Sequence, residues 1–286
     1  MSELGEYFTL PFNQRALLAA ILIGFVNGHF SGYVILRKSA LFTGALSHSL
    51  LPGTAIGFML FGASAMAAFA GSLLVSLITA LGALAIAASS RIDKDAALPI
   101  LCTTSFAAGL LILDKVKLNI ELDGFLFGNI LLLTDADLWY AYGIGLFVYI
   151  MLITLQRPLL VFLFEENIAK AQGIPVRALN YILMTLLVMI LITSLQAVGV
   201  ILALGLLVAP GAITYLFVDS PRALFWGGSI VGVALTTTGL LLSLLFEART
   251  GAVIVLLAGG TFFLCFLVSP KYGLLREWRT KKATEH

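Results

Sequence analysis

One run of the sequence places an ionisable side chain in apolar surroundings. Residues 41–53 read LFTGALSHSLLPG, in which His48 stands between two serines and Pro52 follows four residues later. At helical spacing Gly44, His48 and Pro52 share one face, with Ser47 beside it. Imidazole nitrogen is a preferred ligand of zinc, manganese and iron ions, and a histidine inside an apolar span is costly unless it meets a partner or water. His48 is therefore either a ligand on a metal pathway or a structural residue satisfied within the protein.

A second imidazole, His29, lies in another apolar run that reads Asn-Gly-His-Phe-Ser. It could add a ligand, or it could be a buried donor bonded to a neighbouring carbonyl. The apolar runs contain no paired acids, no histidine-rich metal spacing and no Ser/His/Asp set, which argues against a membrane enzyme. The phosphate-binding motif Gly-x-x-x-x-Gly-Lys-Ser/Thr does not occur either. If ATP drives this chain, another chain must hydrolyse it.

The elements that position both histidines are expected to be membrane-spanning helices. Of the 286 residues, 60% are apolar and only 11% charged, and the mean hydropathy is +1.05, which excludes a soluble domain. A helix needs about 20 apolar residues to cross a bilayer, and continuous runs of that length exclude an alternating barrel pattern. The expected spans are 16–36, 45–61, 65–88, 96–113, 138–164, 179–195, 198–218, 224–246 and 252–268.

The sequence thus predicts an all-α polytopic membrane protein with eight or nine spans in one permease-like domain, residues 1–270. The number of spans is eight if the two runs around Gly199 form one bent helix. Lys and Arg gather in alternate short loops and in the basic tail 271–286, so the positive-inside rule places those loops and the tail in the cytoplasm. With nine spans, the N-terminus would lie outside.

Glycines and prolines favour a transporter over a passive anchor. The 27 glycines, with many Ala and Ser residues, allow helices to approach closely and slide. Pro52 and Pro210 lie inside predicted spans, where we expect them to interrupt the helix and free a carbonyl. Any multi-span bundle collects such residues, so each alone is weak support.

Two loops stand out. Residues 164–175 form a short polar stretch with acids first, Lys170 near its end, and Gly173 and Pro175 to stop it, which predicts a short helix on the cytoplasmic face. An ordinary capped loop helix would have the same pattern. On the other side, residues 114–137 have polar edges around an apolar centre too short to span, which predicts an outer-face cap.

Several blocks of the sequence resemble, in order, the signature of bacterial zinc, manganese and iron ABC importer permeases, the ABC-3 type. The first is VILRKSAL with ALSHSLLPG around His48, and the second is LFGNIL before DLW. The third is EENIAKAQGI, and the fourth is AVGVIL leading to PGA. The last is TGAVIV. Together these blocks cover almost the whole chain.

The resemblance implies a fold related to the vitamin B12 and iron-siderophore importers, in the bacterial cytoplasmic membrane. It implies two permease chains around a central pathway, identical or not, with ABC ATPase subunits inside and a solute-binding protein that delivers a divalent metal from outside. It assigns the metal pathway to the histidine at position 48. It also implies that the stretch 164–175 couples to the ATPase, through Glu165, Glu166, Ala169, Lys170 and Gly173.

One departure from the family pattern falls on the pathway. Members of the family usually have Gly-Asp-Ala-Leu-Ser-His at this place, whereas this chain has Thr-Gly-Ala-Leu-Ser-His, with Gly44 at the position of the Asp. Asp and His at i and i+4 would offer oxygen and nitrogen to one ion, so Gly44 removes a charge. The weaker site could suit passage, a different ion, or a partner chain that supplies the Asp, and His29 could compensate. A secondary transporter or channel that works without ATP is the rival function.

Overall fold

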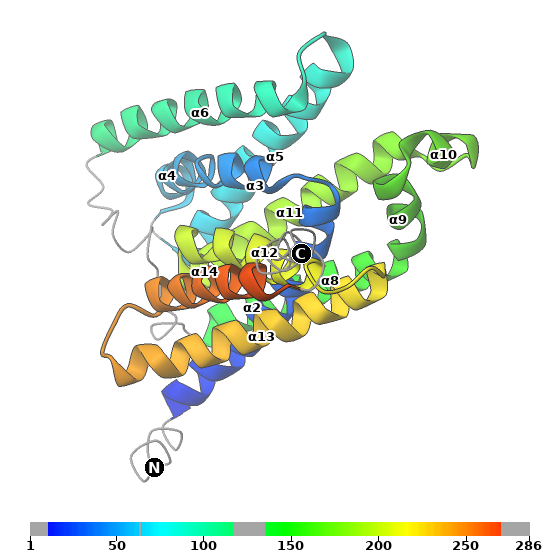
Figure 1. Cartoon of the computed structure of the whole chain (residues 1–286). Helices are drawn as coiled ribbons and strands as arrows, with labels where there is room; N and C mark the ends of the chain where they lie inside the picture. The colour runs from blue at the N-terminus through cyan, green and yellow to red at the C-terminus, as the bar shows by residue number, and fades with distance from the viewer. Residues whose placement is uncertain (1–10, 63, 117–134, 270–286) are drawn as a thin grey trace, which may run out of the picture.

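The fold is a bundle of helices, which a computed structural model describes over residues 11–62, 64–116 and 135–269 (Figure 1). Every regular element in these ranges is an α-helix, so the predicted fold class is confirmed. Most of the predicted cap 114–137 and all of the tail 271–286 lie outside the described residues. The helices are α2 Pro11–Leu36, α3 Ala40–Ser47, α4 Leu50–Phe61, α5 Ala65–Ser89, α6 Lys94–Val116, α8 Asp135–Thr154, α9 Gln156–Phe164, α10 Glu166–Ala171, α11 Val176–Val198, α12 Val200–Tyr215, α13 Pro221–Leu245 and α14 Thr250–Val268.

Length and composition identify seven described helical spans, and the bent pair α8 and α9 makes an eighth. The predicted spans correspond to these helices within a few residues at most ends. The predicted span 198–218 corresponds to α12, whose apolar part, Leu202–Tyr215, is shorter than the described spans. Gly199 separates α11 from α12 with a φ of 83°, so the two runs around it are separate helices.

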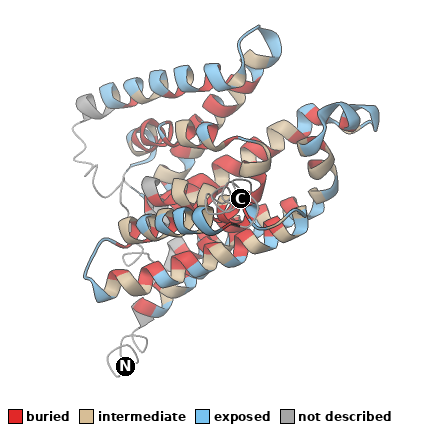
Figure 2. Ribbon diagram, viewed as in Figure 1, coloured by how far each residue is buried: buried red, intermediate tan, exposed pale blue. Residues whose placement is uncertain are grey.

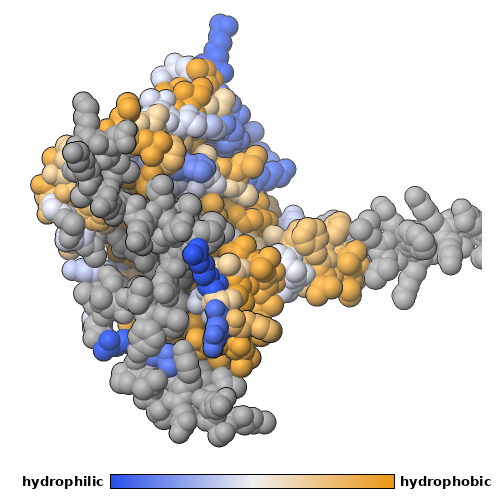
Figure 3. Space-filling view, turned by 90° about the vertical axis from the view of Figure 1, so that its left-hand side faces the viewer, coloured by the Kyte–Doolittle hydropathy of each residue, from blue (hydrophilic) through white to orange (hydrophobic). Residues whose placement is uncertain are grey.

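Burial divides the helices into an inner and an outer group. Buried residues, red in Figure 2, gather on α2, α11 and α12, whereas only 22% of the α6 span and 17% of the α14 span are buried. The exposed positions of these outer helices are apolar, as at Leu111 and Leu256, which are 67% and 76% exposed. Apolar side chains also cover much of the described surface at the end of the molecule seen in Figure 3. Such a surface faces lipid or another membrane-embedded chain.

The helices α2 and α13 meet backbone to backbone. Gly24 and Gly28 of α2 lie against Gly228 and Gly232 of α13, and a Cβ on any of the four would overlap a carbonyl of the other helix or crowd it. The hydroxyl of Thr236 adds a bond across the pair, donating to the Ala20 carbonyl at 2.8 Å. Small residues at four-residue spacing are what permits this approach in a membrane.

Gly28→Ala should lower the free energy of unfolding by roughly 1–3 kcal/mol, because its Cβ would overlap the Gly228 carbonyl oxygen and push the two helices apart. The matched control is Gly143→Ala in α8, where a Cβ meets nothing within 4 Å. The control should leave the protein as stable or slightly more stable, since alanine favours a helix over glycine. Thermal unfolding of both variants in one detergent gives the comparison, and equal midpoints would contradict this account of the α2–α13 contact.

The two prolines expected to interrupt helices behave differently. The break near Pro52 lies earlier, at His48 and Ser49, and Pro52 itself sits in the first turn of α4, where its missing N–H costs nothing. At Pro210 the expectation of an interruption is wrong, because α12 runs unbroken from Val200 to Tyr215. Packing against α2 holds α12 in place, and the Thr214 hydroxyl donates to the Pro210 carbonyl at 2.8 Å.

Candidate functional site

His48 lies at a break in a membrane-spanning helix. It follows α3 and precedes α4, and its N–H donates to the Ala45 carbonyl at 3.2 Å in a tightened final turn. Pro52 has no N–H to donate to the His48 carbonyl one turn before it. An imidazole and a backbone carbonyl without its usual helical donor therefore occur at one position. Discontinuous helices of this kind form the ion sites of many transporters.

The depth of His48 suits a pathway position. The span that contains the break runs from Ala40 to Phe61, so His48 lies about 12 Å along the axis from its start, at about 1.5 Å per residue. Since the hydrocarbon core is about 30 Å thick, this places the imidazole toward the middle of the bilayer. Substrate sites of transporters commonly lie near that midplane.

The His48 side chain is exposed on the surface of the single chain. Its one ring neighbour in the described part of the chain is Phe106 of α6, edge to face, with ring centroids 6.0 Å apart and planes at 76°. One turn before Phe106, the exposed Thr103 directs its hydroxyl to the Pro99 carbonyl at 2.7 Å. An imidazole exposed to lipid is costly, so this face requires either another chain or a water-filled path.

Gly44 leaves open space one turn before His48. A Cβ built at this glycine meets no other atom within 4 Å, so the position could accept a larger side chain without repacking. Ser47, in contrast, is buried, and its hydroxyl donates to the Gly44 carbonyl at 2.7 Å. Within the single chain, the open face at this level is thus formed by Gly44 and His48, while the Ser47 hydroxyl serves the helix.

Hydroxyl bonds to α5 hold the broken span in place. The Ser49 hydroxyl contacts that of Ser76 at 2.9 Å, and Thr54 contacts Ser72 at 2.8 Å. Ser72 also donates to the Leu50 carbonyl at 3.1 Å, which lies in the first turn of α4. These bonds fix the break at Ser49 and the first turns of α4 after it. The imidazole of His48 is consequently presented from a supported backbone.

His29 occupies a different environment. It is 2% exposed, on α2, with its ring 5.1 Å from Tyr149 and 5.4 Å from Phe225, centroid to centroid. The Ser229 hydroxyl donates to the Phe225 carbonyl and lies 3.3 Å from His29 Nδ1, so it accepts from Nδ1–H, and Nε2 has no partner among the described residues. Among the described residues, the ring contacts of His29 and those of His48 have no residue in common. That His29 compensates for Gly44 stays a prediction.

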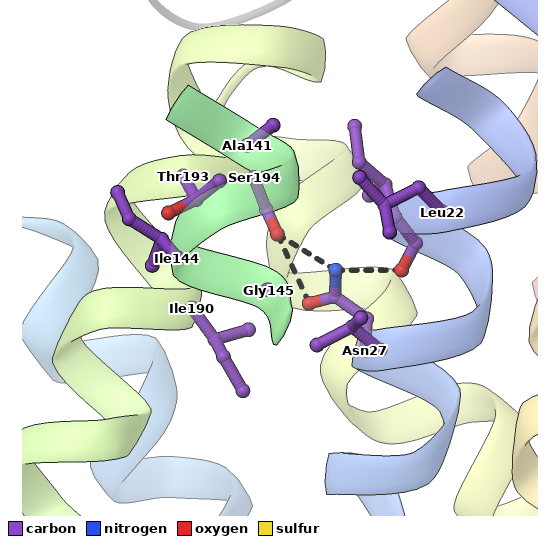
Figure 4. A pocket seen from close by; sticks show the side chains of 10 residues that line it. Leu22, Asn27, Ala141, Ile144, Gly145, Ile190, Thr193 and Ser194 are labelled. Atoms are coloured by element: carbon purple, nitrogen blue, oxygen red, sulfur yellow. Dashed lines mark hydrogen bonds between the residues drawn. The ribbon is translucent and has the colours of Figure 1, made fainter. Parts of the chain in front are cut away.

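Sequence reasoning did not find a buried polar pair beside His29. Asn27 Nδ2 donates to the Ser194 hydroxyl at 2.7 Å and to the Ile23 carbonyl at 2.8 Å, and that hydroxyl lies 3.1 Å from Asn27 Oδ1 (Figure 4). The pair lines a cavity of about 20 Å³ between α2, α8 and α11. Because each polar atom has a partner, the pair reads as a structural link between α2 and α11.

The polar stretch 164–175 contains the short helix α10, at the end of the bundle where α9 also lies (Figure 1). Lys170 and Glu166 form an ion pair at 2.7 Å, and Gly173 takes a φ of 73° just after the helix. Ala169 is fully buried, whereas Glu165 and Ile168 are exposed. The helix is therefore anchored at one position and presents the rest of its surface outward.

Within the described ranges, no three His, Cys, Asp or Glu side chains gather closely enough to hold a metal ion. Metal ions in proteins normally take four or more ligands. The exposed His48 face of one chain therefore offers at most part of a coordination sphere. The remainder would have to come from outside this chain.

Comparison with known proteins accounts for the pattern along almost the whole chain. The ABC 3 transport family matches residues 9–269. The chain is 38% identical to the manganese transport system membrane protein MntC of Halalkalibacterium halodurans, over 100% of this chain and 98% of that protein. It is also 31% identical to the manganese transport system membrane protein MntB of Synechocystis, over 97% of this chain and 90% of the relative.

Solved structures agree with the sequence comparison. PsaBC from Streptococcus pneumoniae, in complex with Fab, matches with a TM-score of 0.84 and 32% identity, over 96% of this chain and 99% of that one. An inward-facing metal-chelate type ABC transporter matches with a TM-score of 0.71 over 88% of this chain and 85% of its own, and at 20% identity it supports the shared fold alone. The chain is a multi-pass bacterial inner-membrane permease and belongs to the ABC 3 transport family.

Proposed function

We propose that this chain is the permease subunit of an ABC importer that moves a divalent transition metal, with manganese as the leading ion. Relatives named as manganese transport proteins cover almost its full length. Zinc and iron are the other candidates, because imidazole suits all three ions and selectivity depends on geometry and availability. The metal is cargo, and it passes through the protein without becoming a resident cofactor.

The observation that carries this proposal is the exposed imidazole of His48 at a helix break toward the middle of the bilayer. One imidazole supplies one ligand, so a second permease chain, identical or not, faces it and completes the path. Gly44 keeps the coordination from this chain weak. Weak coordination suits passage, since an ion that is held too tightly does not leave.

The two ends of the bundle are the faces on which the other subunits of the importer would dock. A separate ABC ATPase drives transport and docks on the stretch 164–175 around α10. Its exposed residues include Glu165, Glu166, Lys170 and Gly173, with Ala169 as the buried anchor. A solute-binding protein delivers the ion at the opposite face, where residues 114–137 form the predicted cap. A rigid short helix on the cytoplasmic face is what an ATPase needs to transmit its motion.

The direct test is metal uptake by the complex reconstituted with its ATPase in vesicles. Manganese uptake should require ATP hydrolysis, and a panel with zinc and iron gives the selectivity. Equal uptake with and without ATP would favour the rival function, a secondary transporter or channel. Uptake of none of the three ions under either condition would contradict a metal pathway altogether.

Gly44→Asp should raise the metal affinity of the assembled complex about tenfold or more. The open space accepts the side chain, and a unit-charge contact at an effective dielectric near 20 exceeds the roughly 1.4 kcal/mol that a tenfold change needs. Gly44→Asn is the matched control, with equal size and no charge. Titration with manganese measures the affinity, and uptake shows whether passage speeds up or stalls. Equal affinities of the Asp and Asn variants would place this face away from the ion.

A further inference from the structure

A second feature, separate from the His48 face, is a cationic cavity at the end of the bundle near α10. Its volume is about 680 Å³, and it lies where several membrane-spanning helices begin or end. The last residues of α2 and α9, the first residue of α6, the last residue of α12 and Glu166 of α10 all contribute. The lining is Ile35, Leu36, Arg37, Lys38, Lys94, Phe162, Leu163, Phe164, Glu166 and Tyr215.

The charges in this cavity do not balance. Arg37, Lys38 and Lys94 line it with a single carboxylate, Glu166, and that carboxylate already pairs with Lys170 at 2.7 Å. In the part of the chain that the structure describes, no carboxylate lies within ion-pair distance of any of the three cations. Asp93 and Asp95, in the turn before α6 and in its first turn, act on Lys94 only from farther away. The cavity therefore has an excess of positive charge that an anion could neutralise.

Arg37 is held in a fixed position there. Its Nη2 donates to the Asn180 side-chain oxygen, and its guanidinium lies 5.1 Å from the centre of the Phe162 ring. Its Nε is buried without a partner in the described part of the chain. Burial lowers the pKa of Arg37 to about 10, against the opposing pull of Glu166 and Asp95, so the group stays charged at neutral pH. A fixed guanidinium that stays charged is well suited to a phosphate.

The cavity also has an apolar side. Leu36, Phe164 and Tyr215 belong both to this cavity and to a neighbouring hollow of about 110 Å³ that continues toward Val218 and Leu224. Asp219 also lines that hollow but is not among the residues that line the larger cavity. A site with cations on one side and apolar residues on the other, at the level where spans end, matches an amphiphile whose charged group lies at the membrane surface.

We propose that this cavity binds the phosphate of an anionic phospholipid, with Arg37 and Lys94 on the headgroup and the Leu36, Phe164 and Tyr215 side against its acyl region. The lipid would then bridge the end of α2 to α9 and α10. Soluble phosphate shares the charge but lacks the apolar part. We therefore assign the site to the lipid and use inorganic phosphate as a competitor.

The test is a titration of the purified full chain with phosphatidylglycerol, followed by native mass spectrometry. Phosphatidylglycerol should bind more tightly than phosphatidylcholine. Lys94→Gln should weaken it about fivefold, since one cation near a membrane surface contributes about 1 kcal/mol. Arg91→Gln is the matched control, an exposed cation in the same loop that does not line the cavity, and it should change binding less than twofold. Unfolding temperatures in phosphatidylcholine confirm that both variants are folded.

Three results would overturn this proposal. Phosphatidylglycerol binding that is unchanged in both Lys94→Gln and Lys38→Gln would place the lipid elsewhere. Displacement of the lipid by equimolar inorganic phosphate would assign the site to a soluble phosphate compound. Displacement of the lipid by the ATPase subunit, together with weaker ATPase binding in Lys94→Gln, would make the cavity a protein docking site.

Discussion

His48→Ala should reduce ATP-driven manganese uptake by about 100-fold or more in the reconstituted complex. Loss of residues that merely support a metal ligand typically costs 10- to 100-fold in affinity or activity, and loss of the ligand itself should cost at least as much. The side chain is exposed, so its removal leaves no buried cavity. The fold should therefore be unaffected, and the defect should lie in transport alone.

Leu41→Ala is the matched control for this variant. Leu41 lies on α3 seven residues before His48, on the same helical face, and is 91% exposed, so its truncation changes that face without removing a ligand. We expect uptake within about threefold of the parent, since a truncated exposed side chain usually changes little. Size measurements on both variants check that the permease chains still assemble. If His48→Ala transports normally, this face of the broken span packs against protein or lipid and the pathway lies elsewhere.

Most of the fold could be predicted because a membrane-spanning helix can be recognised from its own stretch of sequence. Each span must be an apolar run of fixed minimum length, and the charged turns between runs mark its ends. The expected span 96–113, for example, corresponds to α6, Lys94–Val116. The 68° bend between α8 and α9 was not predicted, because residues 138–164 read as one run. Pro158 is the overlooked signal, since its missing N–H leaves the Thr154 carbonyl, where α8 ends, without a donor.

The site was predictable only in part. An imidazole in an apolar span is a local signal that singled out His48, and the family resemblance then favoured a pathway role over a structural one. That Ser47 turns inward and that Phe106 meets the His48 ring depends on how α3 and α6 pack, which the sequence does not encode locally. The cationic cavity brings together Arg37 and Lys94 from separate turns, 57 positions apart in the sequence. The first turn was noted for topology and as part of the family block VILRKSAL, and the second for topology, and only the fold shows that they share a surface.

Ile168→Ser should weaken binding of the ATPase subunit by roughly 4- to 12-fold and lower uptake in proportion. Ile168 is 51% exposed on α10, beside the buried anchor Ala169, so an apolar side chain projects from a polar helix. If α10 is the coupling helix, docking removes this side chain from water. Complete burial of an isoleucine is worth about 1.5–3 kcal/mol, and docking can bury only the exposed half of this side chain. The gain of about 0.8–1.5 kcal/mol corresponds to the stated range of affinity.

Ile92→Ser separates docking from a general loss of apolar surface. Ile92 is 47% exposed in the turn between α5 and α6, on the same predicted cytoplasmic side, so the two substitutions remove nearly the same exposed group. Binding to the immobilised ATPase should change less than twofold for Ile92→Ser, and both variants should unfold at the parent's temperature. A coupling role for α10 requires the two variants to differ. Equal losses would show that the ATPase covers both turns alike, and no loss in Ile168→Ser would mean that the ATPase docks on another part of the cytoplasmic face.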